Sequence, residues 1–176
     1  MLVEIAIFAG LGLVLDKLSF SMPQGGSASF VMLPIILMAI RWGLKGGLTT
    51  GFLIGILQIA IDPKIYHWAQ GLIDYCIAFT VVGFAAVFTR SLRHQNNRAK
   101  SKIILWVAVG SLFGGLLRYA AHTVAGAIFF AEYAGDQNPW VYSIIYNATY
   151  MVPAIIMTAI AACLLFTAAP KLLQSK

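Results

Sequence analysis

Long apolar runs constrain this sequence more than any other feature. A membrane-spanning helix needs about 20 mainly apolar residues in a row, and apolar runs separated by short polar breaks fill most of the 176-residue chain. Hydrophobic residues make up 60% of the chain and charged residues only 10%, whereas soluble domains average roughly 45–50% and about 25%. These values exclude an ordinary cytosolic domain, a disordered chain and a nucleic-acid binder, and they predict an integral membrane protein.

The polar breaks predict one domain, residues 1–176, built as an all-α bundle of six transmembrane helices. The second and third of these helices are too short to cross a bilayer with ease, so we expect them to tilt, thin the bilayer or lie partly inside protein. The six helices are expected at residues 2–20, 29–40, 46–61, 68–89, 103–130 and 141–168.

The distribution of basic residues predicts the orientation of the bundle. Lys and Arg collect in the cytoplasmic loops of membrane proteins. With six crossings, nine of the twelve basic residues fall on one side, so we expect both termini in the cytoplasm. The net charge of +6 then reflects basic residues in cytoplasmic loops and not nucleic-acid binding. The nine are Arg41, Lys45, Arg90, Arg93, Arg98, Lys100, Lys102, Lys171 and Lys176.

Four polar residues lie inside the predicted helices, namely Asp74, Arg118, His122 and Asn147. Ionisable residues within a membrane are functional candidates, because their burial is costly without a partner. At a rise of about 1.5 Å per residue, Asp74, His122 and Asn147 lie roughly 9, 12 and 10 Å below the outer ends of their helices. Arg118 lies one turn deeper than His122. This shared depth on three helices predicts a binding site in the outer half of the bundle.

Aromatic residues crowd the same level, and a carboxylate ringed by aromatic faces suits a flat, cationic ligand. His122 and Asn147 can form hydrogen bonds with ring heteroatoms, and Gly126 lets a ring approach the helix backbone. Structural alternatives remain: an Asp74–Arg118 ion pair, and Asn147 as a bridge between helices. Trp68 and Trp140 are favoured as interface anchors. The other aromatic residues at this level are Tyr75, Phe129, Phe130, Tyr142, Tyr146 and Tyr150.

Four motifs, in their order and spacing, resemble a known family over almost the whole chain. They are Met22-Pro23-Gln24-Gly25-Gly26-Ser27, Leu72-Ile73-Asp74-Tyr75, Leu117-Arg118-Tyr119-Ala120-Ala121-His122 with Ala125-Gly126, and Tyr142-Ser143-Ile144-Ile145-Tyr146-Asn147-Ala148-Thr149-Tyr150. The family is that of the thiamine-specific substrate-binding (S) components of energy-coupling factor (ECF) transporters. The resemblance implies a six-helix protein of the bacterial plasma membrane that captures thiamine from outside. A transmembrane coupling protein and two ATPase subunits would then drive import.

The resemblance also implies roles for individual residues. Asp74, Tyr75, His122, Tyr142 and Asn147 map onto positions that face thiamine in the family, and Gly126, Phe130 and Tyr146 complete the predicted site. Asp74 stands where a familiar member carries Glu, and Phe130 where it carries Trp. Ala6, Ala9 and Gly10 form a small-residue face that resembles the patch meeting the coupling protein, with packing inside the bundle as the alternative.

Two other functions remain open from the residues. The first is an S component for another vitamin or for a thiamine precursor, although riboflavin has no cation to pair with Asp74. The second is a small intramembrane enzyme with Asp74 and His122 as an acid–base pair, but no nucleophile stands at a compatible level. We therefore predict no catalytic residues, no cofactor, no metal and no nucleic-acid partner.

Overall fold

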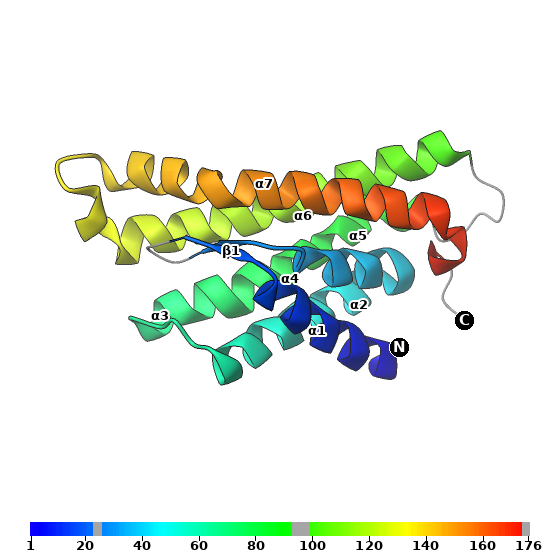
Figure 1. Ribbon diagram of the computed structural model, residues 1–176, viewed down its shortest axis with the longest axis horizontal. Coiled ribbons are helices and arrows are strands. Elements are labelled where there is room, and N and C mark those ends of the chain that lie inside the picture. Colours follow the sequence, from blue (N-terminus) through cyan, green and yellow to red (C-terminus); the bar gives the residue numbers. More distant parts are fainter. Residues whose placement is uncertain (23–25, 93–98, 174–176) are drawn as a thin grey trace.

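The computed structural model describes residues 1–22, 26–92 and 99–173. Its helices lie side by side in an elongated bundle (Figure 1). The longer helices are α1 (Leu2–Lys17), α2 (Met32–Ile61), α6 (Lys100–Phe129) and α7 (Pro139–Ala168). Consecutive short segments form one further helical stretch: α3 (Trp68–Gly71), η1 (Leu72–Ile77), α4 (Ala78–Val82), η2 (Gly83–Ala85), α5 (Ala86–Thr89) and η3 (Arg90–Leu92). Two 3₁₀ turns, η4 (Ala131–Ala134) and η5 (Pro170–Leu173), follow α6 and α7.

Within the described residues, four helical stretches are long and apolar enough to cross a membrane. These stretches are Met32–Ile61, Trp68–Thr89, Lys100–Phe129 and Pro139–Ala168. The sequence-based expectation of an all-α membrane protein is therefore confirmed.

Helix α2 reverses direction at Gly43. This residue has φ 75° and ψ −160°, a combination that is essentially restricted to glycine. The Cβ of Ala39 lies only 2.7 Å from the place where a Cβ on Gly47 would stand, although eight residues of straight helix span about 12 Å. The two arms of α2 thus pack against each other, and they correspond to the helices expected at 29–40 and 46–61.

Several helix ends differ from the predicted ones. Helix α1 ends at Lys17 rather than at residue 20, because β1 (Phe20–Ser21) pairs in antiparallel fashion with β2 (Ser27–Ala28). Helix α7 begins two residues early, because Asn138 caps it by accepting hydrogen bonds from the amides of Trp140 and Val141. Helix α6 also begins early, at Lys100. The predicted positions Pro23, Gln24, Gly25, Arg93, Arg98 and Lys176 lie outside the described residues.

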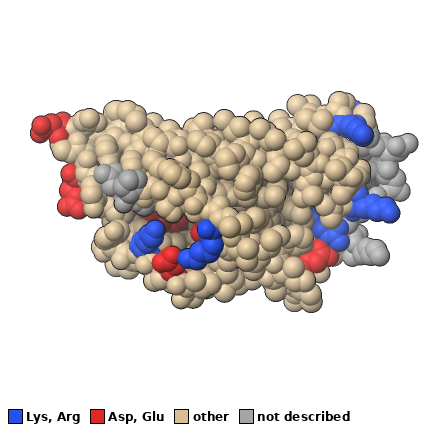
Figure 2. Space-filling model, viewed as in Figure 1, with Lys and Arg blue, Asp and Glu red and all other residues tan. Residues whose placement is uncertain are grey.

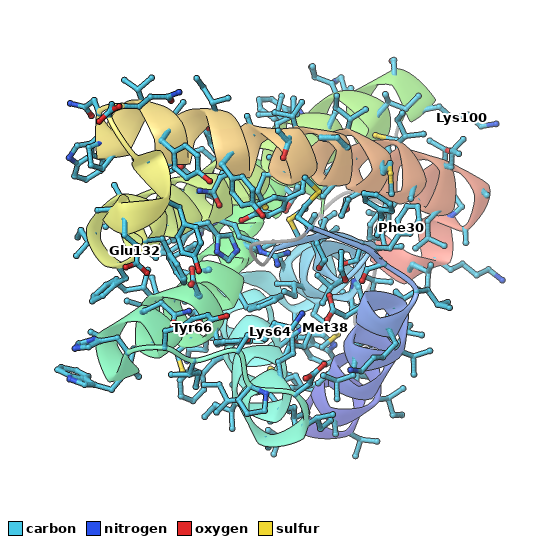
Figure 3. All side chains as sticks on the ribbon, turned by 60° about the vertical axis from the view of Figure 1, so that its left-hand side comes forward. Phe30, Met38, Lys64, Tyr66, Lys100 and Glu132 are labelled. Atoms are coloured by element: carbon cyan, nitrogen blue, oxygen red, sulfur yellow. The ribbon has the colours of Figure 1, made fainter. Side chains whose placement is uncertain are left out.

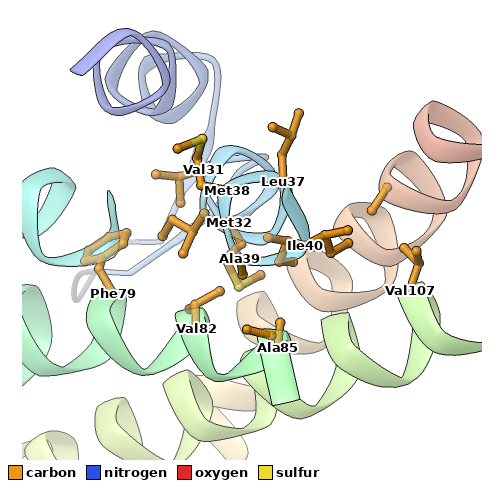
Figure 4. Packing of buried hydrophobic residues seen from close by; sticks show 14 of the residues in the cluster. Val31, Met32, Leu37, Met38, Ala39, Ile40, Phe79, Val82, Ala85 and Val107 are labelled. Atoms are coloured by element: carbon orange, nitrogen blue, oxygen red, sulfur yellow. The ribbon is translucent and has the colours of Figure 1, made fainter. Parts of the chain in front are cut away.

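The apolar core surrounds the first arm of α2 (Figure 4). Met38, Ala39 and Ile40 of this arm are fully buried and belong to the same cluster as Val82 and Val107. Because side chains from α2, α4 and α6 meet in this cluster, the inner part of the bundle is filled by apolar groups. Buried threonine and serine side chains accompany this core, among them Thr89 and Ser111, whereas the buried Arg118 lies further along α6.

Charged side chains are sorted between the two ends of the bundle. Most Lys and Arg side chains visible in Figure 2 gather at its right-hand end, where α1 begins and η5 ends, and acidic groups mark the left-hand end. At the basic end, Arg41 donates to Glu4 at 2.6 Å and to the carbonyl of Leu172 at 3.4 Å, and Trp42 donates to Glu4. These contacts fasten α1, α2 and η5 together.

Candidate functional site

A cavity of about 700 Å³ lies in the half of the bundle toward the acidic end, between the last turns of α1 and α2, the stretch from Gln70 to Phe79, the end of α6 and the start of α7. Its volume falls within the roughly 300–1,000 Å³ of typical small-molecule sites. Its walls come from α1, the segment between α1 and α2, the stretch 58–79, α6 and α7. All eight residues of the predicted ligand site line this cavity: Asp74, Tyr75, His122, Gly126, Phe130, Tyr142, Tyr146 and Asn147.

Asp74 is the centre of a hydrogen-bond network in the cavity wall. The Nδ1 of His122 lies 2.8 Å from Oδ1 of Asp74, and Nε2 of Gln70 donates to Oδ2 at 2.7 Å. The Nε of Arg118 donates to Nε2 of His122 at 3.2 Å. A guanidinium group only donates, so Nε2 of His122 must accept and the ring proton resides on Nδ1, facing Asp74. His122 therefore bridges the side chains of Asp74 and Arg118.

This network corrects one structural alternative for Asp74. A direct Asp74–Arg118 ion pair is not what the described residues form, because His122 lies between the two side chains. The guanidinium carbon of Arg118 instead stands 4.1 Å from the centroid of the Phe79 ring, a cation–π contact. Each carboxylate oxygen of Asp74 can accept more than one hydrogen bond, so the group retains capacity for a ligand.

A π-helical turn presents Asp74 and Tyr75 to the cavity. Segment η1 has the wider i→i+5 pattern, with the amide of Ala78 donating to the carbonyl of Ile73. Such turns carry an extra residue and often occur at functional sites. A Cβ on Gly55 would overlap the carbonyl of Tyr75, so a glycine in α2 makes room for this widened turn. Apolar periodicity did not predict it.

Aromatic rings form the outer part of the cavity wall. Tyr142 and Tyr146 stack at a centroid distance of 5.9 Å with an interplanar angle of 14°. Tyr150 meets Tyr146 edge-on at 6.2 Å, and Phe130 meets Tyr66 edge-on at 5.5 Å. These rings come from α7, from the end of α6 and from the loop before α3, so several elements supply π faces to the cavity that contains Asp74.

Asn147 and Gly126 join helices in addition to lining the cavity. The amide of Asn147 donates to the carbonyl and the hydroxyl oxygen of Ser143, at 2.8 and 3.0 Å, and to the carbonyl of His122 at 3.5 Å. Its carbonyl accepts from Tyr150. A Cβ on Gly126 would overlap the hydroxyl of Ser143. Gly126 thus makes room for Ser143 of α7 and also lines the cavity, and its closeness to a ligand ring stays a prediction.

The predicted coupling face on α1 is divided by the structure. Ala9 is completely buried and belongs to the core cluster, so it packs inside the bundle and is not available to a partner. Ala6 and Gly10 are exposed, and nothing lies within 4 Å of a Cβ placed on Gly10. Only these two residues retain the surface position that the prediction requires.

Several cavity residues were not predicted as part of the site. Gln70 lies one turn before Asp74, and this i, i+4 spacing was a signal that could have identified it. The mouth carries an exposed ion pair between Lys17 and Asp62, with Nζ 2.9 Å from Oδ2. The hydrogen bond from Lys17 lowers the pKa of the Asp62 carboxyl below its ordinary value. This pairing depends on how α1 meets the loop after α2, which local sequence does not reveal.

Comparison with known proteins identifies the family. The family model described as "Thiamine transporter protein" matches residues 2–174. The chain belongs to this family. It is 48% identical over 180 residues to the thiamine transporter ThiT of Bacillus subtilis (strain 168), covering 99% of this chain and 94% of the relative. ThiT of Lacticaseibacillus paracasei is 29% identical over 184 residues, covering 99% and 90%.

A solved structure agrees with the sequence relatives. The structure entitled "Native-SAD phasing for ThiT from Listeria monocytogenes serovar." matches with a TM-score of 0.86 and 27% identity, over 98% of this chain and 96% of that one. Members of the thiamine transporter family are transport components and not enzymes, so the acid–base interpretation of Asp74 and His122 is set aside. Family membership and the apolar helices identify a multi-pass protein of a bacterial membrane.

Proposed function

We propose that this chain is the thiamine-binding S component of an ECF-type transporter, and that it captures thiamine from outside the cell. In this proposal the chain crosses the plasma membrane with six helices, the two arms of α2 counting separately, and both termini lie in the cytoplasm. The half of the bundle that holds the cavity, toward the acidic end, then faces outward. Family membership and the sorting of basic residues to the opposite end support this orientation.

One observation carries the ligand assignment: the Asp74 carboxylate stands in a cavity walled by aromatic rings. Thiamine consists of two flat rings, one of them a positively charged thiazolium, so the carboxylate offsets its positive charge and the aromatic rings add cation–π attraction. Tyr75, His122, Phe130, Tyr142 and Tyr146 are proposed as further ligand contacts, with Asn147 and Gly126 holding α6 against α7 behind them.

The runner-up function is an S component for another vitamin or for a thiamine precursor. A carboxylate in the wall favours a cationic ligand over neutral vitamins such as riboflavin. A precursor that contains only one of the two thiamine rings would fill less of a cavity of about 700 Å³. Competition between thiamine, its separate rings and riboflavin for the purified protein distinguishes these candidates.

Titration of the purified protein with thiamine tests the proposal. Removal of one partner of a buried charge pair costs about 3–5 kcal/mol, so Asp74→Asn should weaken thiamine binding by roughly a hundredfold or more. Asp136→Asn provides the matched control, because Asp136 is exposed and does not line the cavity. An Asp74→Asn variant that folds and binds thiamine like the parent would contradict the assignment.

A neutral analogue examines the charge partnership directly. An analogue with an uncharged ring in place of the thiazolium should bind the parent less tightly than thiamine does. That difference should shrink in Asp74→Asn, since residues and ligand groups that interact are energetically coupled. Equal differences in both proteins would show that Asp74 does not sense the cation.

Transport requires an energy source, and the chain is proposed to obtain it from separate subunits. A transmembrane coupling protein and two ATPase subunits would bind the cytoplasmic half of the bundle. Ala6 and Gly10 are the proposed contact residues on α1, because both are small and exposed and small residues let helices approach closely in lipid.

A further inference from the structure

We propose that Gln70 is a positioning residue for ligand binding, which orients the Asp74 carboxylate and fixes the loop at Lys64–Tyr66 as a wall of the same cavity. This inference rests on the proposed function, because it assigns Gln70 a role in that site. Gln70 is only 3% exposed, so its amide group cannot rely on solvent for hydrogen bonds.

Every polar position of the Gln70 side chain is used, and the partners lie in two different parts of the site. Its Nε2 donates to Oδ2 of Asp74 at 2.7 Å and to the carbonyl of Lys64 at 3.3 Å. Its Oε1 accepts from the amide of Tyr66 at 3.1 Å. A side-chain amide has two N–H donors and one carbonyl oxygen, so one residue links the carboxylate to the loop.

The loop that Gln70 holds is itself part of the cavity. Lys64 and Tyr66 both line it, and in Figure 3 they lie next to each other, Tyr66 on the side of Glu132 and both away from Lys100. The hydroxyl of Tyr75 accepts from the amide of Lys64 at 2.9 Å. The loop is therefore held by the side chains of Gln70 and Tyr75, which lie on either side of Asp74 in the sequence.

This arrangement couples the direction of the carboxylate to the position of the wall. Gln70 and His122 each engage one oxygen of Asp74, and together they fix the plane of the carboxylate. Without Gln70, Oδ2 loses its donor, the carboxylate is free to rotate about its terminal bond, and the Tyr66 amide loses its acceptor. The effect of Gln70 on a cationic ligand should therefore depend on the charge of Asp74.

Thiamine titration of purified Gln70→Leu tests this role, with Gln70→Met as a second variant that keeps the side-chain length without donors. Both variants remove the hydrogen bond that Gln70 donates to the charged Asp74, and loss of such a bond should lower thiamine affinity by about 10- to 100-fold. Thr80→Val is the control, because it removes a hydrogen bond within the same helical stretch, to the carbonyl of Cys76, and Thr80 does not line the cavity. Its affinity should stay within about threefold of the parent.

A double-mutant cycle separates positioning from packing. In an Asp74→Asn background, Gln70→Leu should weaken thiamine binding several-fold less than it does in the parent, because the charge that Gln70 orients is already absent and only the contribution of the Lys64–Tyr66 loop remains. Equal losses with and without the Asp74→Asn substitution, or no loss in either case, would overturn the role of Gln70 while leaving thiamine binding by the parent intact. A parent protein that does not bind thiamine would instead contradict the proposed function together with this inference.

Discussion

Arg118 influences the site without being an obvious ligand contact. It is 5% exposed, and its guanidinium group donates to His122 and lies against the ring of Phe79. Because the Arg118 guanidinium donates to Nε2 of His122, this nitrogen accepts, and the N–H at Nδ1 faces the Asp74 carboxylate. The positive charge of Arg118 also offsets part of the negative charge of Asp74 while the cavity is empty. A bound cation would then share Asp74 with Arg118.

Arg118→Met should lower the thermal stability of the ligand-free protein, because an unpaired buried acceptor costs about 1–3 kcal/mol. Thiamine should raise the melting temperature of this variant by more than it raises that of the parent, because the cation replaces the lost positive charge. Thermal unfolding in detergent, with and without thiamine, measures both effects. Arg90→Met is the control on an exposed arginine, and an equal thiamine-induced shift in Arg118→Met and the parent would refute the idea.

The sequence revealed the central polar residues because depth can be counted along a helix. The count places Asp74, His122 and Asn147 at one level of the bundle. In the structure the His122 ring contacts Asp74, and the His122 carbonyl accepts a hydrogen bond from Asn147. The contacts of Gln70 could not be predicted in the same way. They depend on the path of the Lys64–Tyr66 loop and on a π turn, and neither feature leaves a periodic apolar pattern.

At the scale of helices, glycines determine where the chain turns and where helices meet. Gly43 reverses α2, and Gly55 and Gly126 admit Tyr75 and Ser143. The polar break around Gly43 predicted that two short helices meet there, but the reversal itself depends on a positive φ that the composition does not encode. Likewise, the apolar runs predicted α6 and α7, whereas the exact start of α7 depended on capping by Asn138.

Gly43→Ala should destabilise the fold by about 1–3 kcal/mol, because alanine meets steric strain at φ 75° and ψ −160°. The control is Gly10→Ala, because Gly10 lies in regular helix with open space around a Cβ. It should be neutral or slightly stabilising, since alanine favours helix more than glycine does. Unfolding of both purified variants in detergent compares them, and a Gly43→Ala protein as stable as the parent would show that the reversal does not need glycine.

At the scale of the whole molecule, the ligand cavity and the proposed coupling face lie in different halves of the bundle. The cavity is lined by the last turn of α1, from Leu13 to Lys17, whereas Ala6 and Gly10 lie earlier in α1, between the Glu4–Arg41 pair at the basic end and the middle of the helix. The apolar core lies between them. This separation predicts that coupling and binding can be damaged independently.

Ala6→Trp or Gly10→Leu should abolish thiamine uptake by cells that contain the coupling protein and both ATPase subunits. A bulky side chain keeps a partner helix away, whereas thiamine affinity of the purified variant should stay near that of the parent. Ile160→Trp is the control, because it adds bulk at an exposed position of α7. Uptake that survives both α1 substitutions would reject the coupling face, and loss of binding together with uptake would indicate internal packing.

The π turn at Leu72–Ile77 makes the site sensitive to the number of residues as well as to their identity. Deletion of Leu72 or Ile73 would let ordinary α-helical winding replace the widened turn and would leave Gln70 and Asp74 three residues apart instead of four. The Asp74 carboxylate and the Tyr75 carbonyl that Gly55 admits would then lose their present places beside Gln70 and α2, although every contact residue was still encoded. A point-mutation scan would not reveal this vulnerability, whereas a library of one-residue deletions and insertions through this segment would.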